Sequence, residues 1–249
     1  MLEQYKKLIP LKCFSFEEAS GLFGNNRRAT NILYSLKKKG LIKQIKKNLY
    51  AVMSLETEEP VANCFEIASK IAKEGFVSYH SSLEYYGLTN QVYSNVYVST
   101  AEKNKVISFE DRDYLCLNRD CSFGISQIGL IRISDLERSV LDSIKDFEKI
   151  GGIEELLRCL DMISFLDENK LIDYLERYSS RFLFQKAGYL LSFFPKIKLS
   201  SKFFEICLNH IGSSSRYLYS DLQQELCVFN KKWNLCVPGN LFENLGLGY

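Results

Sequence analysis

The sequence of 249 residues predicts an α+β protein, and three features support this fold class and its division into two domains. Apolar residues recur at helical spacing in the first 40 residues and again over most of residues 151–211. Segments rich in β-branched and aromatic residues lie at about 41–52 and 96–133. Basic residues are concentrated near the N-terminus. We therefore expect a domain at 1–57 and a larger α+β domain at 58–249, divided into a mixed α/β part (58–146) and a mainly helical part with closing strands (147–249).

Charge is unevenly distributed along the chain. Residues 1–54 contain eleven Lys/Arg and three acidic residues, a net charge of +8, whereas the remainder carries −6. A basic segment joined to an acidic body favours a module that binds a polyanion such as DNA. The alternative is a solvated lysine-rich surface without a partner.

The first two predicted helices have clear boundaries. The first spans about residues 2–9 and ends at Pro10, because proline interrupts helical hydrogen bonding. The second spans about 16–23, after Ser15 and Glu18, whose spacing is that of a capping box. Its predicted core positions are Phe16, Ala19, Leu22 and Phe23.

A third helix is predicted over about 27–39, capped by Asn25 or Asn26 and ended by Gly40. Strands at 41–45 and 49–52 follow, joined by a basic turn in which Asn48 can take a positive φ. Helix, helix-turn-helix and hairpin in this order predict a winged helix-turn-helix. The apolar stripe of the third helix is Ala29, Ile32, Leu33 and Leu36.

The other face of this helix and the hairpin carry the predicted DNA-binding residues. Arginine and asparagine read base edges, and lysines neutralise phosphates. Arg27, Arg28, Asn31 and Ser35 are the main candidates for base or phosphate contacts. The full set is Arg27, Arg28, Thr30, Asn31, Tyr34, Ser35, Lys38, Lys39, Lys43, Lys46, Lys47 and Asn48. The alternative is a winged helix used for protein contacts.

The larger domain follows an acidic linker at 54–60. A helix is predicted at 61–73, then a short helix closed by Gly87, and a capped helix that starts near 134–137. Strands are predicted at 96–100, 113–117, 121–125 and 130–133, and a closing strand or hairpin within 216–249. Further helices are predicted at 153–165, 168–179, 181–194 and 201–211, with Asp167 and Ser200 as N-caps.

Two segments of this domain resemble a known family. The stretch from Tyr79 to Leu88 (YHSSLEYYGL), followed by Tyr97–Thr100 (YVST), resembles the AbiEi-type antitoxins, and so does Leu136–Asp142 (LERSVLD). The resemblance covers roughly residues 5–145. It implies a type IV toxin–antitoxin, or abortive-infection, protein that acts in phage defence. Asn48 departs from the glycine common at the wing turn of such proteins.

The resemblance also implies partners and a role. An AbiEi-type protein is a repressor that binds inverted repeats in double-stranded promoter DNA of its own operon. It counteracts a nucleotidyltransferase-like toxin without requiring a stable complex. Two alternatives remain: an antitoxin that binds its toxin directly, and a winged-helix transcription regulator with an unrelated effector domain.

No residue pattern indicates catalysis, a cofactor or a metal. The eight cysteines form no C-x-x-C pair, so we expect reduced, buried thiols rather than zinc ligands. His80 beside Ser81 and Ser82 is expected to be structural, because triads are assembled across a fold. Acidic pairs at Asp111/Asp113 and Glu154/Glu155 are expected to be solvated. We therefore expect a cytoplasmic protein without enzymatic activity and without a membrane partner.

Overall fold

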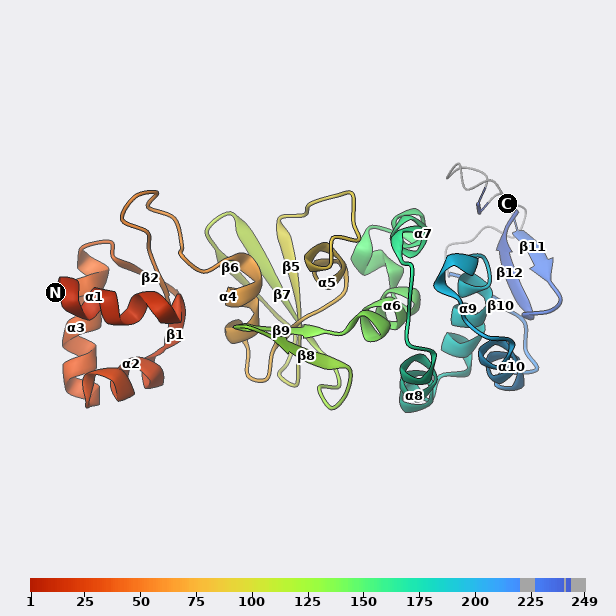
Figure 1. The fold of residues 1–249 in the computed structure, drawn as a ribbon, viewed down its shortest axis with the longest axis horizontal. Helices are drawn as coiled ribbons and strands as arrows, with labels where there is room; N and C mark the ends of the chain where they lie inside the picture. The colour runs from red at the N-terminus through yellow and green to blue at the C-terminus, as the bar shows by residue number, and fades with distance from the viewer. Residues whose placement is uncertain (220–226, 240, 243–249) are drawn as a thin grey trace. The chain divides into compact units, whose positions relative to one another are not determined.

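The computed structural model describes residues 1–219, 227–239 and 241–242, and it has an α+β fold (Figure 1). The chain divides into two compact units: one comprises residues 1–81 and 93–134, and the other residues 82–92 and 135–249. The boundary predicted near residue 57 lies inside the first unit. Part of the predicted closing segment at 216–249 lies outside the described residues.

The first unit begins with three helices and a small sheet. Strand β3 pairs with β1 on one side and β2 on the other, both antiparallel. Strand β1 was not predicted, whereas the helices and the β2–β3 hairpin were. The elements are α1 (Leu2–Leu8), β1 (Cys13–Ser15), α2 (Phe16–Phe23), α3 (Asn26–Lys38), β2 (Ile42–Lys46) and β3 (Leu49–Val52).

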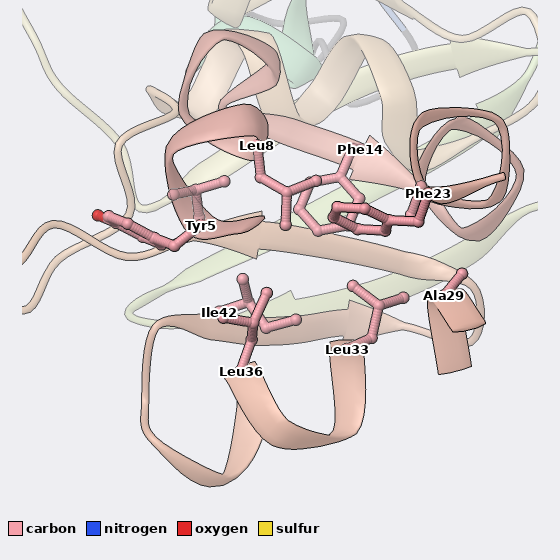
Figure 2. Packing of buried hydrophobic residues seen from close by; sticks show 10 residues of the cluster. Tyr5, Leu8, Phe14, Phe23, Ala29, Leu33, Leu36 and Ile42 are labelled. Atoms are coloured by element: carbon pink, nitrogen blue, oxygen red, sulfur yellow. The ribbon is translucent and has the colours of Figure 1, made fainter. Parts of the chain in front are cut away.

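One apolar cluster holds these elements together (Figure 2). Phe14 from β1 and Leu8 from α1 are fully buried, and Leu36 from α3 is fully buried as well. The capping box predicted for Ser15 and Glu18 is confirmed, with both reciprocal hydrogen bonds present. Leu22, predicted to face this core, is 41% exposed. It lies outside the cluster because the buried stripe of α2 runs through Ala19 and Phe23.

A six-stranded mixed sheet forms the rest of the first unit, in the order β6-β7-β5-β4-β9-β8. Helix α4 packs against β4, β5 and β9 (Figure 1). The predicted helix at 61–73 is shorter than expected because Asn63, not a residue near 60, caps it. The elements are α4 (Cys64–Ile71), β4 (Phe76–Val77), β5 (Asn95–Thr100), β6 (Lys105–Phe109), β7 (Arg112–Asn118), β8 (Ile125–Ile128) and β9 (Ile131–Ser134). Helix α5 (His80–Tyr85) is divided between the two units, because residues 82–92 belong to the second.

Two differences from the sequence prediction concern this sheet. The strand predicted at 121–125 is wrong: residues 125–128 form β8 instead, because Ile125 pairs with Ser134 across the turn at Gly129. Strands β4 and β6 were not predicted. Strand β4 has only two residues, and it is defined by its neighbours β5 and β9 rather than by its own sequence pattern.

The second unit is mainly helical. Helix α6 packs against α8 and α9, and α10 packs against α9. Asp167 caps α8 as predicted, whereas the Ser200 side chain makes no cap hydrogen bond and instead binds Glu168. The elements are α6 (Leu136–Lys145), α7 (Ile153–Met162), α8 (Glu168–Tyr178), α9 (Arg181–Leu191), α10 (Ser201–Asn209), β10 (Arg216–Tyr217), β11 (Cys227–Asn230) and β12 (Leu235–Pro238).

Helix α9 and the segment before β12 are in close contact at Gly188. A Cβ atom at this position would collide with the Trp233 ring and lie 2.9 Å from Cβ of Cys207. We expect Gly188→Ala to lower the free energy of unfolding by about 1–3 kcal/mol through overpacking, measured by urea denaturation. Gly21→Ala is the matched control, because Gly21 is also helical but has no atom within 4 Å of that position. It is expected to stabilise the protein by about 0.5–1 kcal/mol. An unchanged Gly188→Ala variant would contradict the close contact.

Candidate nucleic-acid interface

The start of α3 places two arginines in its first turn. Gly24 adopts a left-handed conformation (φ 96°) that ends α2, and the Asn25 side chain then accepts a hydrogen bond from the backbone N–H of Arg28. The sequence prediction of an asparagine cap is confirmed. The side chains of Arg27 and Arg28 are exposed. The N-terminus of α3 therefore presents two guanidinium groups together with free backbone donors, which suit phosphates and base edges.

The two faces of α3 separate as the sequence predicted. Ala29, Leu33 and Leu36 are buried, and Ile32 is partly buried. Tyr34 is 69% exposed. None of the predicted contact residues is buried: Ser35 and Lys46 are half-buried, and the other ten are exposed. The Thr30 hydroxyl donates to the carbonyl of Asn26 at 2.8 Å, so it is already engaged within the helix.

The β2–β3 hairpin carries the second basic group. Asn48 has a φ of 64°, which confirms the positive φ predicted for this turn. Its carbonyl accepts a hydrogen bond of 2.9 Å from the backbone N–H of Phe16, which ties the turn to α2. The Lys47 side chain is exposed beside it. The turn is thus a fixed basic projection rather than an isolated loop.

One lysine that was predicted to contact DNA, Lys43, forms an ion pair within the protein. Lys43 Nζ lies 2.9 Å from a carboxylate oxygen of Glu110. No local sequence pattern predicts this pair, because the two residues are 67 positions apart. By contrast, the following predicted side chains form no ion pair with any described residue: Arg27, Arg28, Lys38, Lys39, Lys46 and Lys47. Sequence reasoning also missed Lys37, which donates to Gln44 at 2.7 Å.

This difference between the lysines has a measurable consequence. We expect Lys47→Ala to lower the slope of log affinity for DNA against log salt by about 0.9, the value for one phosphate contact. Lys43→Ala is expected to lower it by less, because its ammonium is already neutralised by Glu110. Fluorescence-anisotropy titrations of a DNA duplex at several salt concentrations measure both slopes. Equal slope changes would mean that Glu110 does not hold Lys43.

The other candidate sites of the sequence occupy structural positions. His80 is fully buried and makes an edge contact with the Tyr93 ring at 4.2 Å. The Ser81 hydroxyl accepts a hydrogen bond from the Tyr97 backbone at 3.0 Å. The expectation that Glu155 is solvated is wrong: it is only 3% exposed, because it lies on the buried side of α7. Glu154, by contrast, is exposed.

The expectation of buried cysteines holds for half of them: Cys13, Cys116, Cys159 and Cys207 are buried, whereas Cys64, Cys121, Cys227 and Cys236 are half-buried. Burial raises the pKa of Cys13, Cys159 and Cys207 to about 12, so these thiols stay protonated at neutral pH. Across residues 1–219 and the described part of the C-terminal segment, no cluster of three or more His, Cys, Asp or Glu residues can hold a metal ion. In the same residues, no helix has the length and apolar character needed to span a bilayer.

Comparison with known proteins defines the fold but not the activity. No protein-family model matches the sequence, and no curated protein matches it either. The structure is similar to the crystal structure of the RV2827C protein from Mycobacterium tuberculosis, with a TM-score of 0.62 and 11% sequence identity. The similarity covers 98% of this chain and 95% of that chain. The two proteins therefore share a mixed α+β fold over nearly their whole length.

Proposed function

We propose that this chain is a DNA-binding antitoxin of the AbiEi type, in which residues 1–57 form a winged helix-turn-helix that represses its own operon. In this proposal the remainder of the chain counteracts a nucleotidyltransferase-like toxin and has no enzymatic activity. The observation that carries the DNA-binding part is the exposed basic face of α3, with Arg27 and Arg28 exposed in its first turn.

The geometry of the small N-terminal sheet and helices supports the DNA-binding part. An exposed helix with arginines at its N-terminus is suited to the major groove, where the first turn of a recognition helix contacts base edges. The hairpin turn at Lys46 and Lys47 would lie against the phosphate backbone as a wing. Because neither lysine is paired within the described residues, both charges are available to release counterions from DNA.

The antitoxin part rests on the resemblance of residues 79–100 and 136–142 to AbiEi-type proteins. In the structure, the second of these segments forms most of α6, where Arg138 and Asp142 are buried. That motif therefore contributes to folding rather than to an exposed contact surface. The residues that oppose a toxin would lie elsewhere in the larger part of the chain.

Direct contact with the toxin is the second candidate mechanism, and one observation favours it. Val228 and Phe229, at the centre of β11, are 58% and 51% exposed. Exposed apolar side chains on a sheet-edge strand are a feature of protein contact sites. A stable stoichiometric complex with the product of the neighbouring gene would favour this mechanism over the type IV scheme.

A promoter-binding titration tests the proposal. The full chain is titrated against the DNA upstream of its own gene and against a scrambled duplex of equal length. We expect the promoter to bind at least tenfold more tightly at physiological salt, and two copies to occupy an inverted repeat. Equal affinity for both duplexes would overturn the repressor role. Co-expression with the neighbouring gene then tests whether growth is restored, and pull-down tests whether a complex forms.

A further inference from the structure

The second unit contains a cavity of about 550 Å³ at the junction of α6, α9 and β10. A cavity of this size is in the range of small-molecule sites. None of its lining residues belongs to the unit that contains α3, and nothing in the DNA-binding proposal uses it. Its lining includes three cations (Lys145, Lys186 and Arg216), four aromatic residues (Phe147, Phe182, Tyr217 and Tyr219) and two acidic residues (Asp146 and Glu148).

Lys186 is the unusual residue of this cavity. It is only 6% exposed, yet within the described residues it has neither a hydrogen bond nor an ion pair. Its ammonium lies 5.0 Å from the centre of the Phe147 ring and 4.8 Å from that of Phe182. Two aromatic rings offset part of the cost of burying this charge, but they accept none of its three N–H bonds in the way a carboxylate would.

Burial also changes the acidity of this amine. Desolvation lowers the pKa of Lys186 to about 8, although Asp146 and Glu148 act in the opposite direction. Asp146 forms an ion pair with Lys149, and this pair partly compensates the carboxylate charge. An anion bound in the cavity would supply the acceptor that Lys186 lacks and would favour its charged form.

Two further cations and two tyrosines border the same cavity. The Arg216 guanidinium lies 5.1 Å from the centre of the Phe182 ring. The Lys186 ammonium contacts the same ring. Lys145 lines the cavity and is exposed, and its ammonium lies 4.7 Å from the centre of the Tyr178 ring. Tyr219 makes an edge contact with Phe147 at 5.6 Å, and Tyr217 is 37% exposed. Cations that converge beside aromatic side chains suit a ligand with a phosphate and a planar ring.

We propose that this cavity binds a nucleoside phosphate, whose phosphate contacts Lys186 and Arg216 and whose base lies against Tyr217 or Tyr219. The same chemistry occurs in a free nucleotide and in the 5′-phosphorylated end of a nucleic acid. Isothermal titration calorimetry of the full chain separates these sources by comparing ATP, AMP, adenosine, inorganic phosphate and a single-stranded oligonucleotide with and without a 5′-phosphate.

The expected result is that ATP or AMP binds at least tenfold more tightly than adenosine. Lys186→Met keeps the aliphatic stem and is expected to weaken that binding at least tenfold. Lys202→Met, which removes an exposed lysine of α10 outside the cavity, is expected to leave it unchanged. Binding only of the 5′-phosphorylated oligonucleotide would identify a nucleic-acid end as the ligand and support the same phosphate contacts. Equal binding of adenosine and AMP, or no binding of any phosphorylated probe, would overturn the proposal.

A second measurement uses the unmodified protein, so it does not depend on how a variant folds. Reductive methylation at pH 8, read out by mass spectrometry, is expected to modify Lys186, and saturating ATP is expected to slow that modification at least fivefold. Modification of Lys202 serves as the internal control and should not change. Lys186→Met is also expected to melt at or above the wild-type temperature, because it removes an unpaired buried charge. If ATP fails to protect Lys186, the cavity does not hold the phosphate there.

Discussion

Replacing Arg27 and Arg28 together with alanine is expected to weaken promoter binding by about 2–4 kcal/mol, or about 30- to 1,000-fold, in a gel-shift or anisotropy titration. Both side chains are exposed in the first turn of α3, and neither forms an ion pair with a residue that the structure describes. The Asn25 cap binds the backbone N–H of residue 28, so the substitution keeps the hydrogen bond that starts the helix. The loss is therefore expected in DNA affinity and not in folding.

A double variant of the hairpin lysines tests whether phosphate binding and sequence recognition depend on different residues. Lys46→Ala with Lys47→Ala is expected to weaken binding to promoter and scrambled DNA alike and to reduce the salt slope by about 2. The arginine pair is instead expected to reduce the preference for the promoter. Comparison of the two double variants on both duplexes therefore assigns a role to each group.

The matched control removes two positive charges from the second unit. Arg158→Ala with Lys202→Ala changes exposed residues of α7 and α10 and is expected to leave DNA affinity within about twofold of wild type, because neither residue belongs to the unit that contains α3. If the control weakens binding as much as Arg27→Ala with Arg28→Ala does, net charge and not the α3 surface governs DNA binding. If none of the variants changes affinity, the groove assignment is wrong.

Local signals made the N-terminal elements predictable. The capping box at Ser15 and Glu18, the asparagine cap and the turn at Asn48 each depend on residues within four positions of one another. Their hydrogen bonds are set by the chain segment itself. The exposed face of α3 followed from the same short-range periodicity, so most of the proposed contact residues could be identified from sequence.

Contacts between distant residues could not be predicted in this way. Strand β1 has three residues and exists because Cys13–Ser15 pairs with β3. The Lys43–Glu110 ion pair removes a predicted phosphate contact, and it joins segments with no common sequence pattern. Likewise, only the fold brings the Arg216 guanidinium to the Phe182 ring, since the two residues are far apart in the sequence. The periodicity of apolar residues shows which side of a helix or strand is buried. Which other segment packs against that side depends on the topology of the fold.

Asp142→Ala is expected to give the largest loss of stability, about 3–5 kcal/mol in the free energy of unfolding, measured by urea denaturation. Asp142 is 2% exposed and Arg138 is 1% exposed on α6. The carboxylate lies 3.4 Å from Nε of Arg138 and accepts a hydrogen bond of 2.5 Å from the Tyr178 hydroxyl. Removing it takes this acceptor away from a buried guanidinium and a half-buried phenol.

An exposed Asp–Arg ion pair with the same spacing provides the control. Asp173 and Arg177 on α8 have the same i,i+4 spacing and lie 2.8 Å apart, but both side chains are about half exposed. Asp173→Ala is therefore expected to cost no more than about 0.5 kcal/mol. The double substitution Arg138→Met with Asp142→Leu is expected to be less destabilising than Asp142→Ala alone, because it removes both buried charges. Equal losses for Asp142→Ala and Asp173→Ala would show that burial does not determine the strength of the α6 pair.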